Sequence, residues 1–137
     1  MSAPFRHPHR VTYADCTVGN HVYYGRYLEL LEAARGEFFR HLGTSLREWQ
    51  EREVIFPVLE CHLHYRAMAR YDEQLLIEVR PTLAQRVRLN FVHRIVGPGD
   101  RVILEAETHH LCAGLNEKPR RLPEALLAAL APFLGAA

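Results

Sequence analysis

The chain has 137 residues, of which 24% are charged, and a formal net charge of +1. This length is typical of one domain, so we expect residues 1–137 to form a single domain with its own hydrophobic core. The balanced charge argues against a nucleic-acid or anionic-membrane partner, since either favours a concentrated excess of Lys and Arg. Three cysteines are too few for a disulfide framework. There is no apolar signal core and no membrane-spanning run, and the sequence therefore predicts a cytoplasmic protein.

The first half of the chain contains one long predicted helix. We expect residues 1–8 to be a loose lead-in, residues 10–14 a short strand and residues 15–21 a polar loop. A helix of about twenty residues should follow and end at Gly43, where a glycine suits the C-terminal stop. Its apolar residues recur at helical spacing and form one stripe: Tyr27, Leu30, Leu31, Ala34, Phe38 and Leu42. Thr44 or Ser45, with Glu48 behind it, can cap a further helical turn over residues 44–50.

The second half alternates with the period of a β-strand. Residues 54–65, 74–82, 86–96 and 101–113 are predicted strands, and Pro57 indicates a sheet edge or a bulge. The turn at residues 97–100 predicts a hairpin between the last two strands, and a short helix is expected over residues 123–134. This order predicts an α+β fold in which an antiparallel sheet wraps around one long central helix. The open edges of such a sheet need a partner strand, so we expect a homo-oligomer, a dimer at least.

Residues 10–35, the segment Phe56-Pro57-Val58 and the turn from Tyr65 to Asp72 carry a resemblance to a known family. The chain resembles the hot-dog-fold thioesterases, in the branch that includes 4-hydroxybenzoyl-CoA thioesterase and short-chain acyl-CoA thioesterases. The resemblance implies a hot-dog fold and the hydrolysis of an acyl-CoA thioester to free acid and CoA, without a cofactor. It also implies a dimer or a dimer of dimers with its sites at the subunit interface.

In this family a backbone N–H at the start of the long helix polarises the thioester carbonyl, because unpaired donors and the positive end of the helix dipole meet there. Mapped onto this sequence, the donor is the N–H of Tyr24, with Val22 and Tyr23 beside it. Tyr23 and Tyr24 can equally be ordinary core or interface aromatics, and both interpretations can hold together.

The catalytic carboxylate of the family is the second Asp of an Asp-x-Asp loop, and this chain departs from that pattern. Its corresponding residues are Asp15 and Thr17, and a threonine hydroxyl is no base at neutral pH. Asp15 can take over the role if the loop is extended, although it can also be a loop carboxylate that binds nearby amides. Glu32, eight residues after Tyr24, is the second candidate, unless it forms a structural pair with Arg35 or with an arginine of a strand.

A third possibility is that Thr17 holds a water molecule while His21 acts as the base. The substitution at Thr17 also supports an alternative function, a hot-dog protein that binds acyl-CoA without hydrolysing it.

Arginines near strand ends are candidates for binding the phosphates of CoA, namely Arg66, Arg86 and Arg88, with Arg70 nearby. Each can equally belong to an ordinary solvated strand face. His62 and His64 share one strand face, and His110 and Cys112 share another. No zinc-type spacing joins them, so we expect no metal site and assign the two strand histidines to the surface or to a subunit interface.

Overall fold

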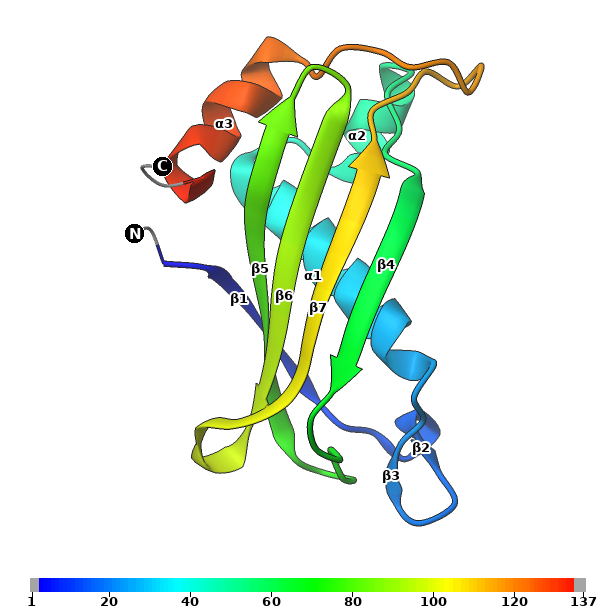
Figure 1. The fold of residues 1–137 in the computed structure, drawn as a ribbon, viewed down its shortest axis with the longest axis vertical. Helices are drawn as coiled ribbons and strands as arrows, with labels where there is room; N and C mark the ends of the chain where they lie inside the picture. The colour runs from blue at the N-terminus through cyan, green and yellow to red at the C-terminus, as the bar shows by residue number, and fades with distance from the viewer. Residues whose placement is uncertain (1–2, 135–137) are drawn as a thin grey trace.

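The computed structural model describes residues 3–134 and is dominated by one antiparallel sheet with a long helix lying across it (Figure 1). The sheet has the strand order β1-β5-β6-β7-β4. Its strands are β1 Phe5–Arg10, β4 Val58–Tyr65, β5 Gln74–Gln85, β6 Arg88–Gly97 and β7 Arg101–Leu111. A small hairpin pairs β2 Cys16–Thr17 with β3 His21–Val22, and the helices are α1 Arg26–Leu42, α2 Leu46–Glu51 and α3 Glu124–Leu134. The predicted α+β arrangement around one central helix is confirmed.

Helix α1 forms over the predicted apolar stripe and buries that stripe against the sheet. Tyr27, Leu30, Leu31, Ala34 and Phe38 are all buried in the core. Each large apolar side chain removed from water in this way contributes about 1.5–3 kcal/mol. The helix ends as predicted, because Gly43 adopts a left-handed backbone with φ of 109° and donates its N–H to the Arg40 carbonyl.

The inner face of the sheet supplies the other half of the core. Alternate residues of β5 and β6 point toward α1 and are almost fully buried, as the period of two requires: Leu75, Ile77, Val79, Leu89, Phe91 and Ile95. The hairpin predicted around residues 97–100 joins β6 to β7 through a short 3-10 turn. Within residues 3–134, no helix is long and apolar enough to cross a membrane.

The two short helices also follow their sequence signals. Ser45 caps α2: its hydroxyl accepts the Glu48 N–H, and the Glu48 carboxylate accepts the Ser45 N–H, both at 3.1 Å. Helix α3 begins directly after Pro123 and buries Leu126 and Leu130.

The N-terminal segment differs from the prediction. The strand is β1, Phe5–Arg10, which pairs with β5 from Phe5 opposite Val79 to Arg10 opposite Gln74. The expected strand at residues 10–14 and the loose lead-in at residues 3–8 are therefore wrong, while residues 1 and 2 lie outside the described residues. Pro8 concealed this strand, but β1 is an edge strand, where a missing N–H costs no sheet hydrogen bond.

Strand β4 forms the opposite edge of the sheet, as Pro57 indicated. It begins at Val58, directly after that proline, and pairs only with β7. Cys61, Leu63 and Tyr65 face the helix side as predicted, but no residue of β4 is fully buried and Tyr65 remains 49% exposed. The sequence gives the correct face but not the burial, because α1 covers the inner strands and leaves this edge open.

Candidate functional site

The loop before α1 is organised by Asp15, which is only 1% exposed. One carboxylate oxygen accepts the Thr12 N–H at 2.8 Å and lies 2.7 Å from His9 Nε2, and the other accepts Arg26 Nε at 2.7 Å. Burial alone would raise the pKa of Asp15, but the hydrogen bonds from Thr12, His9 and Arg26 outweigh it and lower the pKa to about 2. The carboxylate is thus fully engaged in tying β1, the loop and α1 together.

The loop is not extended at Asp15, although an extended loop is the condition for Asp15 to take the place of the family's catalytic carboxylate. Residues Tyr13–Asp15 form a 3-10 turn, which directs Asp15 inward, whereas Thr17 lies on the exposed strand β2. The two side chains therefore do not reach the same space. His21 pairs with Thr17 in the small hairpin, and its Nδ1 lies 3.1 Å from the Val22 carbonyl.

Tyr24 lies at the N-terminal tip of α1, immediately before the N-cap residue Gly25. Two nearby N–H groups are engaged, since Tyr23 donates to Asp15 O and Arg26 donates to Tyr23 O. Within the described part of the chain, residues 3–134, the Tyr24 N–H has no hydrogen-bond acceptor. Its carbonyl accepts the Tyr65 hydroxyl at 3.1 Å, which fixes the tip against the end of β4.

A cavity of about 300 Å³ opens between α1, the segment that follows α2 and the start of β4. Most of its wall is apolar and comes from Phe39, Val54, Phe56, Val58 and Phe91, among others. Its polar side chains include Glu32, Arg35, Gln50 and His110. An apolar pocket with a few converging polar groups is the usual form of a small-molecule site.

Glu32 lies at the exposed rim of this cavity and is a free carboxylate. Among residues 3–134 it forms no ion pair and no hydrogen bond, so the expected structural pair with Arg35 is absent. A carboxylate without such partners keeps its lone pairs available for a water molecule or a substrate.

Arg35, one helical turn beyond Glu32, is the residue that sequence reasoning weighed only as a structural partner. It is 8% exposed, and its one hydrogen bond within residues 3–134 reaches His93 Nε2 at 3.4 Å. Thr108 and His110 continue this buried polar group, with a Thr108 hydroxyl to His110 Nε2 distance of 3.0 Å. The signal in the sequence was weak: a cation placed between the stripe residues Ala34 and Phe38.

Both buried histidines are neutral. Burial, and next the Arg35 cation, lower the pKa of His93 to about 3 and that of His110 to about 4. Their Nδ1 atoms lie 3.1 Å from the Glu78 and Phe56 carbonyls, so each Nδ1 carries the donated proton and each Nε2 is an acceptor.

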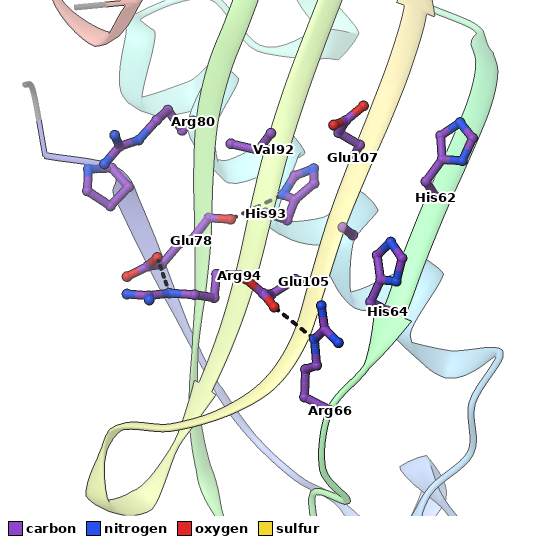
Figure 2. Close-up of a pocket in the computed structure, with 12 residues that line it drawn as sticks. His62, His64, Arg66, Glu78, Arg80, Val92, His93, Arg94, Glu105 and Glu107 are labelled. Carbon is purple, nitrogen blue, oxygen red and sulfur yellow. Dashed lines mark hydrogen bonds and ion pairs between the residues drawn. The ribbon is translucent and has the colours of Figure 1, made fainter.

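A larger cavity, of about 510 Å³, lies on the outer face of the sheet, away from α1 (Figure 2). Its charged side chains mostly neutralise one another: Arg66 bonds Glu105 at 2.8 Å, and Arg94 bonds Glu78 at 3.1 Å. His62 and His64 point outward on this face, as predicted. The described residues contain no group of three ligands able to hold a metal ion. Among the residues that line this cavity there is no helix N-terminus to bind an oxyanion, so we do not place the reaction there.

The arginines expected to bind phosphates do not form one cluster within the chain. Arg66 follows Tyr65, which pairs with Leu104, whereas Arg88 pairs with Leu111, seven residues along β7. At about 3.3 Å per residue, this separation is roughly 23 Å. Arg86 lies in the β5–β6 turn beside Arg88, at the end of the sheet opposite Arg66.

Comparisons with known proteins agree with this architecture. Residues 11–130 match the model of the Thioesterase-like superfamily. The acyl-CoA thioester hydrolase YbgC of Escherichia coli is 36% identical over 125 residues, which cover 90% of this chain and 93% of that protein. A solved structure from Thermus thermophilus is 31% identical, with a TM-score of 0.87 over 93% of this chain and 98% of that one. The 1,4-dihydroxy-2-naphthoyl-CoA thioesterase of Synechocystis shares the fold at 22% identity, with a TM-score of 0.86 over 93% of this chain and 95% of that one.

Proposed function

Because the chain belongs to the thioesterase-like superfamily and has its hot-dog fold, we propose that it hydrolyses acyl-CoA thioesters to free acids and CoA. The observation that carries the proposal is the pairing of two features along α1: an unsatisfied N–H at its N-terminal tip, at Tyr24, and a free carboxylate beside an apolar cavity, at Glu32. The first can bind the oxyanion that develops on the thioester carbonyl, and the second can activate water.

The contacts of Asp15 favour Glu32 as the base. Asp15 has both carboxylate oxygens engaged and a pKa of about 2, so it is a poor proton acceptor and has no room for a water molecule. Glu32 makes no such contacts. In this mechanism Glu32 removes a proton from water as the water oxygen attacks the carbonyl carbon. The tetrahedral intermediate then collapses with loss of the CoA thiolate, and the protonated Glu32 returns its proton to the thiolate sulfur. Thr17, His21, Val22 and Tyr23 have no chemical role in this mechanism.

The distance between the two groups requires a second copy of the chain. Glu32 is eight residues beyond Tyr24, so the two are about 12 Å apart along the helix axis. Hydrolysis needs both groups within a few ångströms of one carbonyl. A single protomer therefore cannot supply the complete site.

Antiparallel pairing of two β4 edges would assemble it. A two-fold axis near Cys61 and His62, the middle of Val58–Tyr65, places Tyr65 of one copy opposite Val58 of the other. Tyr65 bonds the Tyr24 carbonyl and Val58 lines the cavity, so this pairing brings the helix tip of each copy to the cavity of its partner. The unpaired backbone of β4 and the half-exposed apolar side chains along it support this interface.

The test is release of free CoA from a panel of acyl-CoAs of different lengths. We expect turnover by the wild-type protein and a loss of at least about 100-fold in kcat for Glu32→Gln, the size typical of general-base catalysis. Glu37→Gln, on the same helix but bonded to Arg40 at the surface, is the matched control and should keep full activity. CoA binding without hydrolysis of any thioester would instead support the non-hydrolytic binding protein.

A further inference from the structure

Arg35 is a buried cation without a counter-ion. Within the described chain no carboxylate oxygen lies within 4 Å of it, and its one hydrogen bond, to His93, is long at 3.4 Å. The guanidinium has five N–H donors, so most of its donor capacity is unused. A buried charge in this state is strongly unfavourable unless something pairs with it.

The surroundings of Arg35 compensate its charge only weakly. His93 and His110 are neutral, and the nearby Thr108 carries no charge. Glu32 is the one acidic side chain in the cavity lining, and its charge acts on Arg35 through space. It lies at the exposed rim and forms no ion pair with the guanidinium, so it compensates the charge only in part, and burial still lowers the pKa of Arg35. The inner end of the cavity therefore has a net positive charge.

The rest of the cavity wall restricts the kind of ligand that can reach Arg35. Phe39, Phe56 and Phe91 contribute to an apolar lining. The volume of about 300 Å³ equals the liquid volume of about ten water molecules, which suits a short acyl group. A ligand that fits both features has a short apolar body and an anionic end.

We propose that the preferred acyl group carries a carboxylate at its far end, so that the substrate class is the CoA thioester of a short dicarboxylic acid. This inference rests on the proposed function, because it takes the cavity beside Glu32 as the acyl pocket. The Arg35 guanidinium binds the terminal carboxylate through two parallel N–H···O hydrogen bonds, and this bidentate pairing is stronger and more specific than a single contact. Glu32, about 4.5 Å nearer the helix N-terminus, then lies beside the thioester.

Binding of CoA thioethers tests this inference independently of hydrolysis. S-(5-carboxypentyl)-CoA and S-hexyl-CoA have the same chain length and differ only in the terminal group, and neither can be hydrolysed. By calorimetry we expect the carboxylated thioether to bind the wild-type protein about 10–150-fold more tightly, as a hydrogen-bonded charge pair implies. Arg35→Met should abolish this ratio, while Arg40→Met, on the same helix at the surface, should leave it unchanged.

The outcomes separate the two proposals. Equal or tighter binding of S-hexyl-CoA by the wild-type protein overturns the inference, as does a preference that survives in Arg35→Met. If Arg35→Met fails to fold, Arg35→Lys keeps the charge without the fork and should retain only part of the ratio.

The second experiment compares adipyl-CoA, heptanoyl-CoA and 4-hydroxybenzoyl-CoA as substrates. A higher kcat/KM for the hydroxyaryl substrate than for adipyl-CoA also overturns the inference. Failure to hydrolyse these three or any other acyl-CoA of the panel refutes the proposed function but leaves the binding result standing.

Discussion

Replacing Asp15 by Asn separates a structural role from a catalytic one. The substitution keeps the shape of the side chain but removes the charge that Arg26 and His9 contact, at 2.7 Å each. A pKa held at about 2 instead of the ordinary 3.8 corresponds to roughly 2–3 kcal/mol of stabilisation at neutral pH. In Asp15→Asn the new side-chain NH₂ also faces an N–H donor, of Arg26 or Thr12, and this unpaired contact lowers the free energy of unfolding further. We expect Asp15→Asn to lower the free energy of unfolding by at least this amount at pH 7.

The pH dependence gives this prediction a second, independent check. The pKa of Asp15 is lower in the folded protein, so its stabilisation is complete well above pH 3.8 and is lost as the pH falls toward 2. The difference between wild type and Asp15→Asn in urea unfolding should therefore shrink by about half at pH 3. Asp72→Asn is the control, because Asp72 is exposed and its positive φ suits asparagine. If Asp15→Asn unfolds like the wild type yet abolishes hydrolysis, Asp15 is the catalytic carboxylate and our assignment of Glu32 is wrong.

Three further predictions concern the edge, the buried histidines and a helix cap. Leu59→Lys, at a half-exposed position of the β4 edge, should give a monomer in sedimentation experiments and abolish hydrolysis, whereas Leu115→Lys in an exposed loop should do neither. The pKa of His110 is about 4 in the folded protein, against an ordinary value of 6.5, so the unfolded state takes up the proton first as the pH falls. The free energy of unfolding should therefore drop by about 2 kcal/mol between pH 7 and 5 through this residue alone. His110→Asn should remove that part of the decline. Ser45→Ala should lower the free energy of unfolding by about 1 kcal/mol, measured in urea.

The sequence predicts the parts of this fold that depend on local periodicity. Helix α1, its stop at Gly43 and the cap at Ser45 are encoded by residues within one or two turns of each other. Strand β1 was misplaced because its stability comes from β5, almost seventy residues away, and Pro8 is acceptable only because β1 lies at the edge.

In the candidate site, too, local features could be predicted from the sequence and contacts between distant residues could not. The position of Tyr24 at the helix tip could be predicted from the resemblance and is found there. The engagement of Asp15 could not, because it depends on His9 from β1 and on a 3-10 turn that places the side chain inward. The missing ion pair at Arg35 could not be predicted either, since only the folded structure shows that no carboxylate of residues 3–134 lies within 4 Å of it.

If each site combines Tyr24 of one copy with Glu32 of the other, two inactive variants should restore each other. Tyr24→Pro removes the backbone donor, with Tyr24→Ala as a control that keeps it. A mixed dimer of Tyr24→Pro and Glu32→Gln contains one doubly defective site and one intact site. Random exchange of equal amounts makes about half of the dimers mixed, so the mixture should regain about a quarter of wild-type activity. A site built within one chain gives no recovery, because every chain in the mixture then carries a defect, and that result would refute the shared site.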